Sequence, residues 1–372
     1  MFYTSSALQA LEWICVKRGR NGHQIVLELL RKREASTFIH IAAENGMAIP
    51  VFEVLSNRDS YMNSYSMDPL LQRDSSGLNV LHCVLKGPNL PLTLMVVEHF
   101  SPSELLSALS AKCPEPAINL IINEGIEKFE SYRGFHYVHT VNCNFNEKFG
   151  VALLVHKGDT RSGRVCIDFD GTTESTILTF KDGKINLNKL YCWNTWNDVS
   201  SLLSTVQYVL DTLHYSFKYF CQFDISTPAN LVEYLISPLS AEQRRDVYLT
   251  ESTASGETPL HRAIIKGDSE CVTLIFVSLE NKTQYHHEII AATNNSFENS
   301  LHTALIYGRL DIFQTIYSFL PDDAMLEVLI EADKEHSRTV LETAISLHPH
   351  RKELIVTILD SLEPYEQYQL IK

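Results

Sequence analysis

The middle of the sequence carries cysteine, histidine and aspartate side chains in an order that suits nucleophilic catalysis by a thiol. A cysteine attacks as its thiolate, and a helix N-terminus or a nearby histidine lowers the thiol pKa. Cys192 lies just before a predicted helix over 197–221, and His139 and Asp168 fall on predicted strands. A second order places Cys113 ahead of the segment 114–129, with His136 or His139 as the base.

This outline of a small sheet and a long helix resembles the papain-like and deubiquitinase-like cysteine proteases. The resemblance implies a thiol hydrolase with Cys192, His139 and Asp168 as its triad, or with Cys113 and His136 in the other order. No diagnostic motif surrounds these cysteines. An inert protease-like scaffold and a binding platform without a reaction therefore stand beside the enzyme as alternatives.

A pair of carboxylates offers a different chemistry in the same segment. The string VCIDFDGTT at 165–173 resembles the first motif of the haloacid dehalogenase family. That resemblance implies that Asp168 attacks a phosphate and that Asp170 acts as acid and base. The family's other motifs are missing, and the segment is too short for a doubly wound sheet. A hairpin strand that ends in Asp-Gly explains the string more simply.

The elements that must position these residues form a separate module. Apolar segments at 135–145, 148–158, 163–171 and 175–187 read as strands, because Gly-Asp, Ser-Gly and Asp-Gly turns separate them. The amphipathic helix over 197–221 follows. We expect a small α+β domain over 130–225, inserted between helical segments over 1–129 and 226–372.

The flanking segments contain an internal repeat. TPLHRAIIKG begins at Thr258, NSLHTALIYG at Asn299, TFIHIAAENG at Thr37 and NVLHCVLKGP at Asn79, and a weaker copy begins at Thr339. These copies resemble the ankyrin repeat, whose signature is T-P-L-H-x-A. The resemblance implies pairs of stacked helices, with the signature histidines bonding the backbone of adjacent units. We therefore expect no metal at His40, His82, His261 or His302.

The copies are longer than the usual period of about 33 residues. His261 and His302 lie 41 residues apart, and His40 and His82 lie 42 apart. The excess predicts an additional helix in each unit, at 101–112, 239–250 and 321–333. The fold expected is mostly α: a solenoid of divergent repeats of about 40 residues with the inserted α+β domain.

Ankyrin arrays bind partner proteins through loop tips and the inner helices, so the resemblance implies a protein-binding module. The positions just before each signature are the candidate contacts, and Phe297 is the favoured anchor because aromatic residues dominate interfaces. The full set is Ser76, Gly77, Ser255, Glu257, Phe297, Glu298 and Asn299.

The divergent copies and the glutamates near the C-terminus also resemble type IV secreted ankyrin effectors of intracellular bacteria. That likeness implies a host protein as the partner, met in the host cytoplasm or nucleus. A monomer is the default expectation.

Composition excludes several classes of function. The net charge is −14, and residues 226–372 hold eleven Lys and Arg against twenty-two Asp and Glu, so nucleic-acid binding is not expected and a basic partner is favoured. The eight cysteines form no CxxC pair, which indicates reduced thiols in a cytosol-like compartment. No apolar run is long enough for a bilayer span, and no nucleotide-binding loop or metalloprotease motif occurs, so we expect no cofactor and no metal.

Overall fold

The computed structural model describes residues 35–46, 51, 54–55, 58–65, 68–87, 90–126, 225–280, 282–348 and 350–371, together with six strands between 131 and 185. This part of the chain is mostly helical, compatible with an α-helical repeat solenoid. It divides into a first unit, Met1–Leu105 with Ile126–Asp224, and a second unit, Leu106–Gly125 with Ile225–Lys372. The helix expected over 197–221, together with Asp170 and Cys192, lies outside the described residues.

The helices of the first unit include a packed pair, α3 and α6, that carry signature histidines. His40 on α3 donates from Nε2 to the Gln72 carbonyl at 3.0 Å. The described helices of this unit are α3 (Ala35–Glu44), α5 (Arg58–Tyr65), α6 (Val80–Lys86) and α7 (Leu90–Glu98), and α8 (Pro102–Leu109) begins in it.

Arg58, whose side chain is 15% exposed, links α5 to the segments around Asp68, His99 and Glu104. Arg58 pairs with Asp68 and Glu104 and donates to the His99 carbonyl at 2.7 Å.

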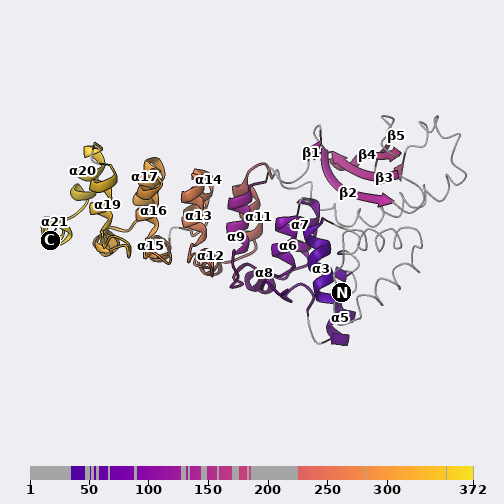
Figure 1. Ribbon diagram of the computed structural model, residues 1–372, viewed down its shortest axis with the longest axis horizontal. Helices are drawn as coiled ribbons and strands as arrows, with labels where there is room; N and C mark the ends of the chain where they lie inside the picture. The colour runs from indigo at the N-terminus through magenta and orange to yellow at the C-terminus, as the bar shows by residue number, and fades with distance from the viewer. Residues whose placement is uncertain are drawn as a thin grey trace, which may run out of the picture. The chain divides into compact units, whose positions relative to one another are not determined.

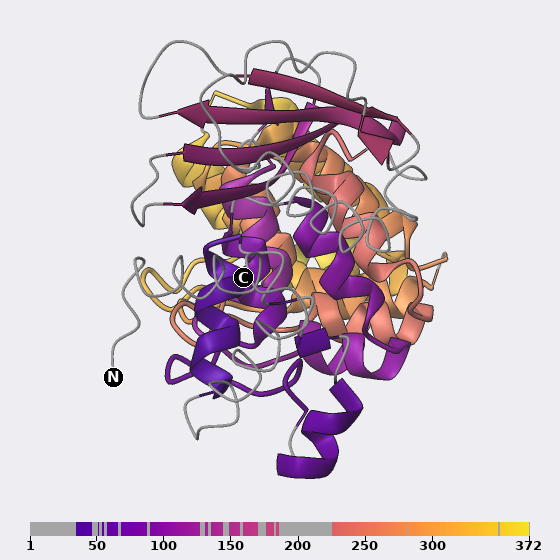
Figure 2. The same ribbon diagram turned by 90° about the vertical axis from the view of Figure 1, so that its right-hand side faces the viewer.

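The strands of the first unit form one antiparallel sheet in which each strand pairs with the next along the chain (Figure 2). The order is β1 (Ser131–Tyr132), β2 (Phe135–Cys143), β3 (Phe149–His156), β4 (Asp159–Phe169), β5 (Thr176–Lys181) and β6 (Lys184–Ile185). Short connections between successive strands suffice for such a meander, as the Gly-containing turns in the sequence predict.

The second unit is a row of helix pairs (Figure 1). The first helices are α9 (Ala117–Glu124), α13 (Pro259–Lys266), α16 (Ser300–Ile306) and α19 (Val340–Leu347). Their partners, the second helices, are α11 (Pro228–Ile236), α14 (Ser269–Val277), α17 (Leu310–Phe319) and α20 (Lys352–Asp360). First helices pack on first helices, and α11, α14 and α17 pack in the same order.

An additional helix follows several of the second helices. These third helices are α12 (Ala241–Tyr248), α15 (Thr283–Ala291) and α18 (Met325–Ile330), with the short η3 (Asp322–Ala324) before α18. The helices predicted at 101–112, 239–250 and 321–333 are thus present as α8, α12 and η3 with α18. A last helix, α21 (Pro364–Ile371), packs against α18.

The repeat signature determines the local structure of α13. Thr258 caps the helix, Pro259 occupies its first turn, and Gly267 ends it with φ 75°. Only a residue without Cβ adopts that left-handed conformation at little cost. Leu260, Ala263 and Ile264 are fully buried, so the apolar face of this short helix is covered by its neighbours.

The buried signature histidines join one pair to the next. His261 Nε2 donates to the Glu298 carbonyl at 3.0 Å, and His302 Nε2 donates to the Arg338 carbonyl at 3.1 Å. Glu298 directly precedes Asn299, the N-cap residue of α16, and Arg338 directly precedes Thr339, the N-cap residue of α19. Asn119 occupies the same position in α9, and its Nδ2 donates to the Glu257 carbonyl at 3.1 Å. An amide therefore takes the histidine's place in this pair.

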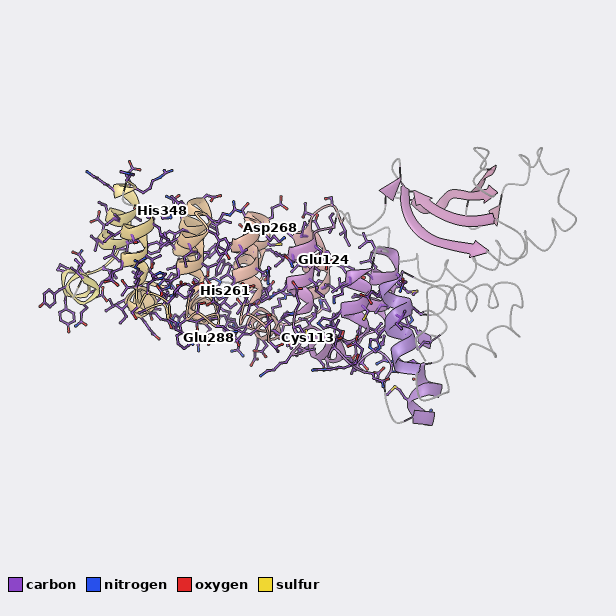
Figure 3. The ribbon with its side chains drawn as sticks, viewed as in Figure 1. Cys113, Glu124, His261, Asp268, Glu288 and His348 are labelled. Carbon is purple, nitrogen blue, oxygen red and sulfur yellow. The ribbon has the colours of Figure 1, made fainter. Side chains whose placement is uncertain are left out.

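The pair α9–α11 is interrupted in sequence. Gly267 and Asp268 alone connect α13 to α14, whereas residues 125–227 lie between α9 and α11. Gly125 has a φ of 68°, like Gly267, and Thr227 caps α11 as Asp268 caps α14. Two residues connect α13 to α14, whereas the connection from α9 to α11 contains the same kind of two residues with 101 more, 126–226, inserted between them. Figure 3 shows Glu124, Asp268 and His348 along one edge of the second unit and Cys113 along the opposite edge.

Joining Gly125 directly to Thr227 should leave the second unit folded, since a glycine and a capping residue then connect α9 to α11 as Gly267 and Asp268 connect α13 to α14. The ψ of Gly125 must change from −171° toward the 28° of Gly267, and glycine adopts either value. We expect residues 106–125 linked to 227–372 to show a helical circular dichroism spectrum and one cooperative urea transition. A control that begins at Ile225 lacks α9 and uncovers the faces of α11 and α13, so its transition should fall to lower urea. Loss of cooperativity in the joined chain alone would contradict the assignment of α9 and α11 to one pair.

Candidate functional site

The loops that lead into the first helices of the second unit share one design. Each of these finger loops, 252–257, 294–298 and 333–338, is closed by a backbone hydrogen bond from its first residue to its last, of 3.0, 3.1 and 3.0 Å respectively. Each also contains a residue with positive φ just before its last position: Gly256, Phe297 and Ser337. The loops therefore present similar tips in a regular series.

Neighbouring finger loops are hydrogen-bonded to one another. The Asn295 amide donates to the Ser255 carbonyl at 3.0 Å, and the Lys334 amide donates to the Ser296 carbonyl at 2.8 Å. On the other side, the Thr253 amide donates to the Cys113 carbonyl at 3.1 Å. These bonds hold the tips at fixed spacing, which pre-organises them for contact with a partner and reduces the entropy lost on binding.

Phe297 stands out among the tip residues. Its φ is 58°, a region that bulky side chains rarely adopt, and the equivalent position in the preceding finger loop is Gly256. The side chain is 52% exposed, and the Lys334 Nζ lies 5.4 Å from the centre of the ring. A strained and exposed aromatic residue costs stability without filling a core, which marks it as a candidate for function.

Further exposed apolar side chains lie at the C-terminal ends of the first helices. Ile306 and Tyr307 at the end of α16 are 42% and 48% exposed, and Leu347 at the end of α19 is 45% exposed. Tyr307 and Leu347 occupy corresponding positions, where α13 has the exposed Lys266. Sequence reasoning missed all three residues. Tyr307 directly precedes Gly308 and Leu347 directly precedes His348, at the ends of their helices.

The other predicted contact residues differ in accessibility. Ser76 is exposed and Gly77 has φ 81°, both in the loop before α6 in the first unit. In the second unit Ser255 and Glu298 are half-buried, and Glu257 forms an ion pair of 2.5 Å with Arg262.

Asn299 is fully buried and acts within the fold. Its Oδ1 accepts from the His302 amide at 3.1 Å, and its Nδ2 donates to the Val328 carbonyl at 3.0 Å. We therefore leave Asn299 out of the candidate surface. The candidate surface comprises the tips of the finger loops 252–257, 294–298 and 333–338, centred on Phe297, and is called the Phe297 surface below.

The described catalytic candidates do not assemble into a triad. Cys113 is buried in the second unit, where its Sγ donates to the Glu115 carbonyl at 3.0 Å. His139 pairs with Leu153, which pairs with Val165, so Asp168 lies two strands away and three positions further along. The resulting Cα separation is roughly 14 Å. His136 pairs with Val155 and lies further still from Asp168.

Buried titratable groups in the described residues have structural surroundings. Burial lowers the pKa of His261 to about 4, although its hydrogen bond to the Glu298 carbonyl acts in the opposite direction. Burial also raises the pKa of the Cys83 thiol to about 12, which removes its thiolate at neutral pH.

Two further properties concern metals and membranes. Among the described residues, no three His, Cys, Asp or Glu side chains lie close enough together to hold a metal ion. In the same part of the chain, none of the helices combines the length and the apolar character that crossing a membrane needs. No protein-family model matches the sequence, and no curated protein matches it either.

Proposed function

We propose that this chain is an ankyrin-like repeat protein that captures a partner protein through the Phe297 surface. One observation carries the proposal: Phe297 is exposed and held in a left-handed conformation that the preceding finger loop assigns to glycine. The finger loops form a hydrogen-bonded row, and aromatic side chains at the centre of such a rigid surface dominate binding energy.

The resemblance to secreted ankyrin effectors extends the proposal to a host protein as the partner, met in the host cytoplasm or nucleus. The alternative of a thiol hydrolase depends on Cys192, which lies outside the described residues. The register of the sheet separates His139 from Asp168, and Cys113 is buried. These observations favour binding over catalysis.

Replacement of Phe297 by glycine should abolish capture while the fold is retained. Glycine relieves the strain at φ 58°, but it also adds unfolded-chain entropy, so we expect the free energy of unfolding to stay within about 1 kcal/mol of the parent. The measurement is affinity capture from host-cell extract with quantitative mass spectrometry, paired with urea denaturation.

Val277→Ser serves as the matched control, because Val277 is an exposed apolar residue on the second helix α14 and belongs to no finger loop. Proteins captured by the parent should be retained by V277S and lost from F297G. An unchanged set of proteins on F297G would contradict the proposal.

A further inference from the structure

The ring of Phe297 already holds a cation within the chain. The Lys334 Nζ lies 5.4 Å from the ring centre, which is within the range of cation–π attraction. Half of the Phe297 side chain nevertheless remains exposed. A partner cation on this ring competes with Lys334, and arginine stacks on such rings better than lysine because its guanidinium group is planar and weakly hydrated.

The charges around Phe297 favour a cationic partner. Glu298 follows it directly, with its carboxylate accepting from Asn294 Nδ2 at 2.8 Å, and Glu335 is exposed on the neighbouring finger loop. Over a longer range, residues 226–372 hold twice as many acidic as basic residues. Such an excess attracts basic segments and steers them toward the surface during encounter.

We propose that the partner presents a basic segment whose arginine stacks on the Phe297 ring. This inference rests on the proposed function, since it identifies the chemistry that the Phe297 surface recognises. Glu298 and Glu335 pair with the guanidinium group or with adjacent cations. Lys334 already contacts part of the ring. The surface therefore selects a segment whose arginine can displace the lysine ammonium group from the ring.

The test uses the full chain and a displayed library of random 12-residue peptides. Clones that bind the parent but not F297A are sequenced and synthesised, each also with its arginines replaced by citrulline, which is isosteric and uncharged. We expect arginine to be enriched, and affinity to fall about tenfold with citrulline. Binding should also weaken as salt rises from 50 to 300 mM.

Phe297→Leu is the matched variant, because leucine keeps an apolar side chain at φ 58° and removes the aromatic ring. F297L should weaken the arginine peptides about as much as citrulline does and should leave the citrulline peptides unaffected. Clones that require Phe297 but bind citrulline and arginine forms equally would overturn the cationic inference alone.

A library without a single Phe297-dependent clone would count against the proposed function as well. A dimer of this chain, seen by sedimentation and lost in F297A, would identify a second copy as the occupant and also overturn the inference.

Discussion

Gly256→Ala is expected to lower the free energy of unfolding of the second unit by about 3 kcal/mol. The φ of Gly256 is 71°, which costs an alanine about 1 kcal/mol. A Cβ built there would lie 2.7 Å from the backbone nitrogen of Asn295, too close for any real contact. The neighbouring finger loop must then move, and the hydrogen bond from Asn295 to the Ser255 carbonyl is lost, at about 1 to 2 kcal/mol.

Gly77→Ala provides the matched control for this substitution. Gly77 has a φ of 81° in the loop before α6, and no atom lies within 4 Å of the position its Cβ would take. Only the conformational cost of about 1 kcal/mol should appear there. Urea denaturation of both variants measures the difference, and equal losses would show that the finger loops are not held as close together as described.

Acidification should weaken the second unit through His261, by about 3 kcal/mol between pH 7 and pH 4. Burial lowers the folded-state pKa of His261 from 6.5 to about 4, so the fold prefers the neutral ring. The contribution is therefore complete above pH 6.5 and is lost as the pH falls toward 4. The preference comes from burial, because the charged ring would lose its hydration in the core. In the neutral ring Nδ1 accepts from the Thr258 amide at 3.3 Å and lies 2.8 Å from the Thr258 hydroxyl, while Nε2 donates to the Glu298 carbonyl.

His261→Asn isolates this contribution from the other buried histidines. An asparagine amide already makes the equivalent bond at Asn119, so the variant should fold at pH 7. Its stability should fall less steeply than the parent's between pH 6.5 and pH 4, as measured by urea midpoints. Parallel curves for parent and variant would mean that His261 does not hold the neutral form in the fold.

Short-range sequence signals predicted the local structure well. Thr258, Pro259 and Gly267 mark the ends of α13 because capping and left-handed turns depend on the residues themselves. The pairing of α9 with α11 could not be predicted in this way. Asn119 replaces the signature histidine in α9, and the partner helix begins more than a hundred residues later, so no local pattern connects the two.

The sequence predicted only part of the candidate site. Phe297 precedes a signature, so its place at a loop tip follows from sequence position. The exposure of Ile306, Tyr307 and Leu347 at the helix ends could not be predicted, because it depends on how closely the next pair covers each helix. Asn299 was included because its position resembles a tip, but its polar side chain is used in capping the helix.

The interrupted pair has a consequence for how the chain is made. Ribosomes add about 5 to 20 residues per second, so α9 emerges several seconds before α11 and waits still longer for α13. Throughout that delay α9 lacks α11 and α13, the helices on which it packs in the folded second unit. The uninterrupted pairs from α13 to α20, synthesised last, are expected to assemble first and then recruit α9. The row of helix pairs is thus completed from its C-terminal end toward α9, opposite to the order of synthesis. During the delay, α9 is the segment that a chaperone is expected to bind.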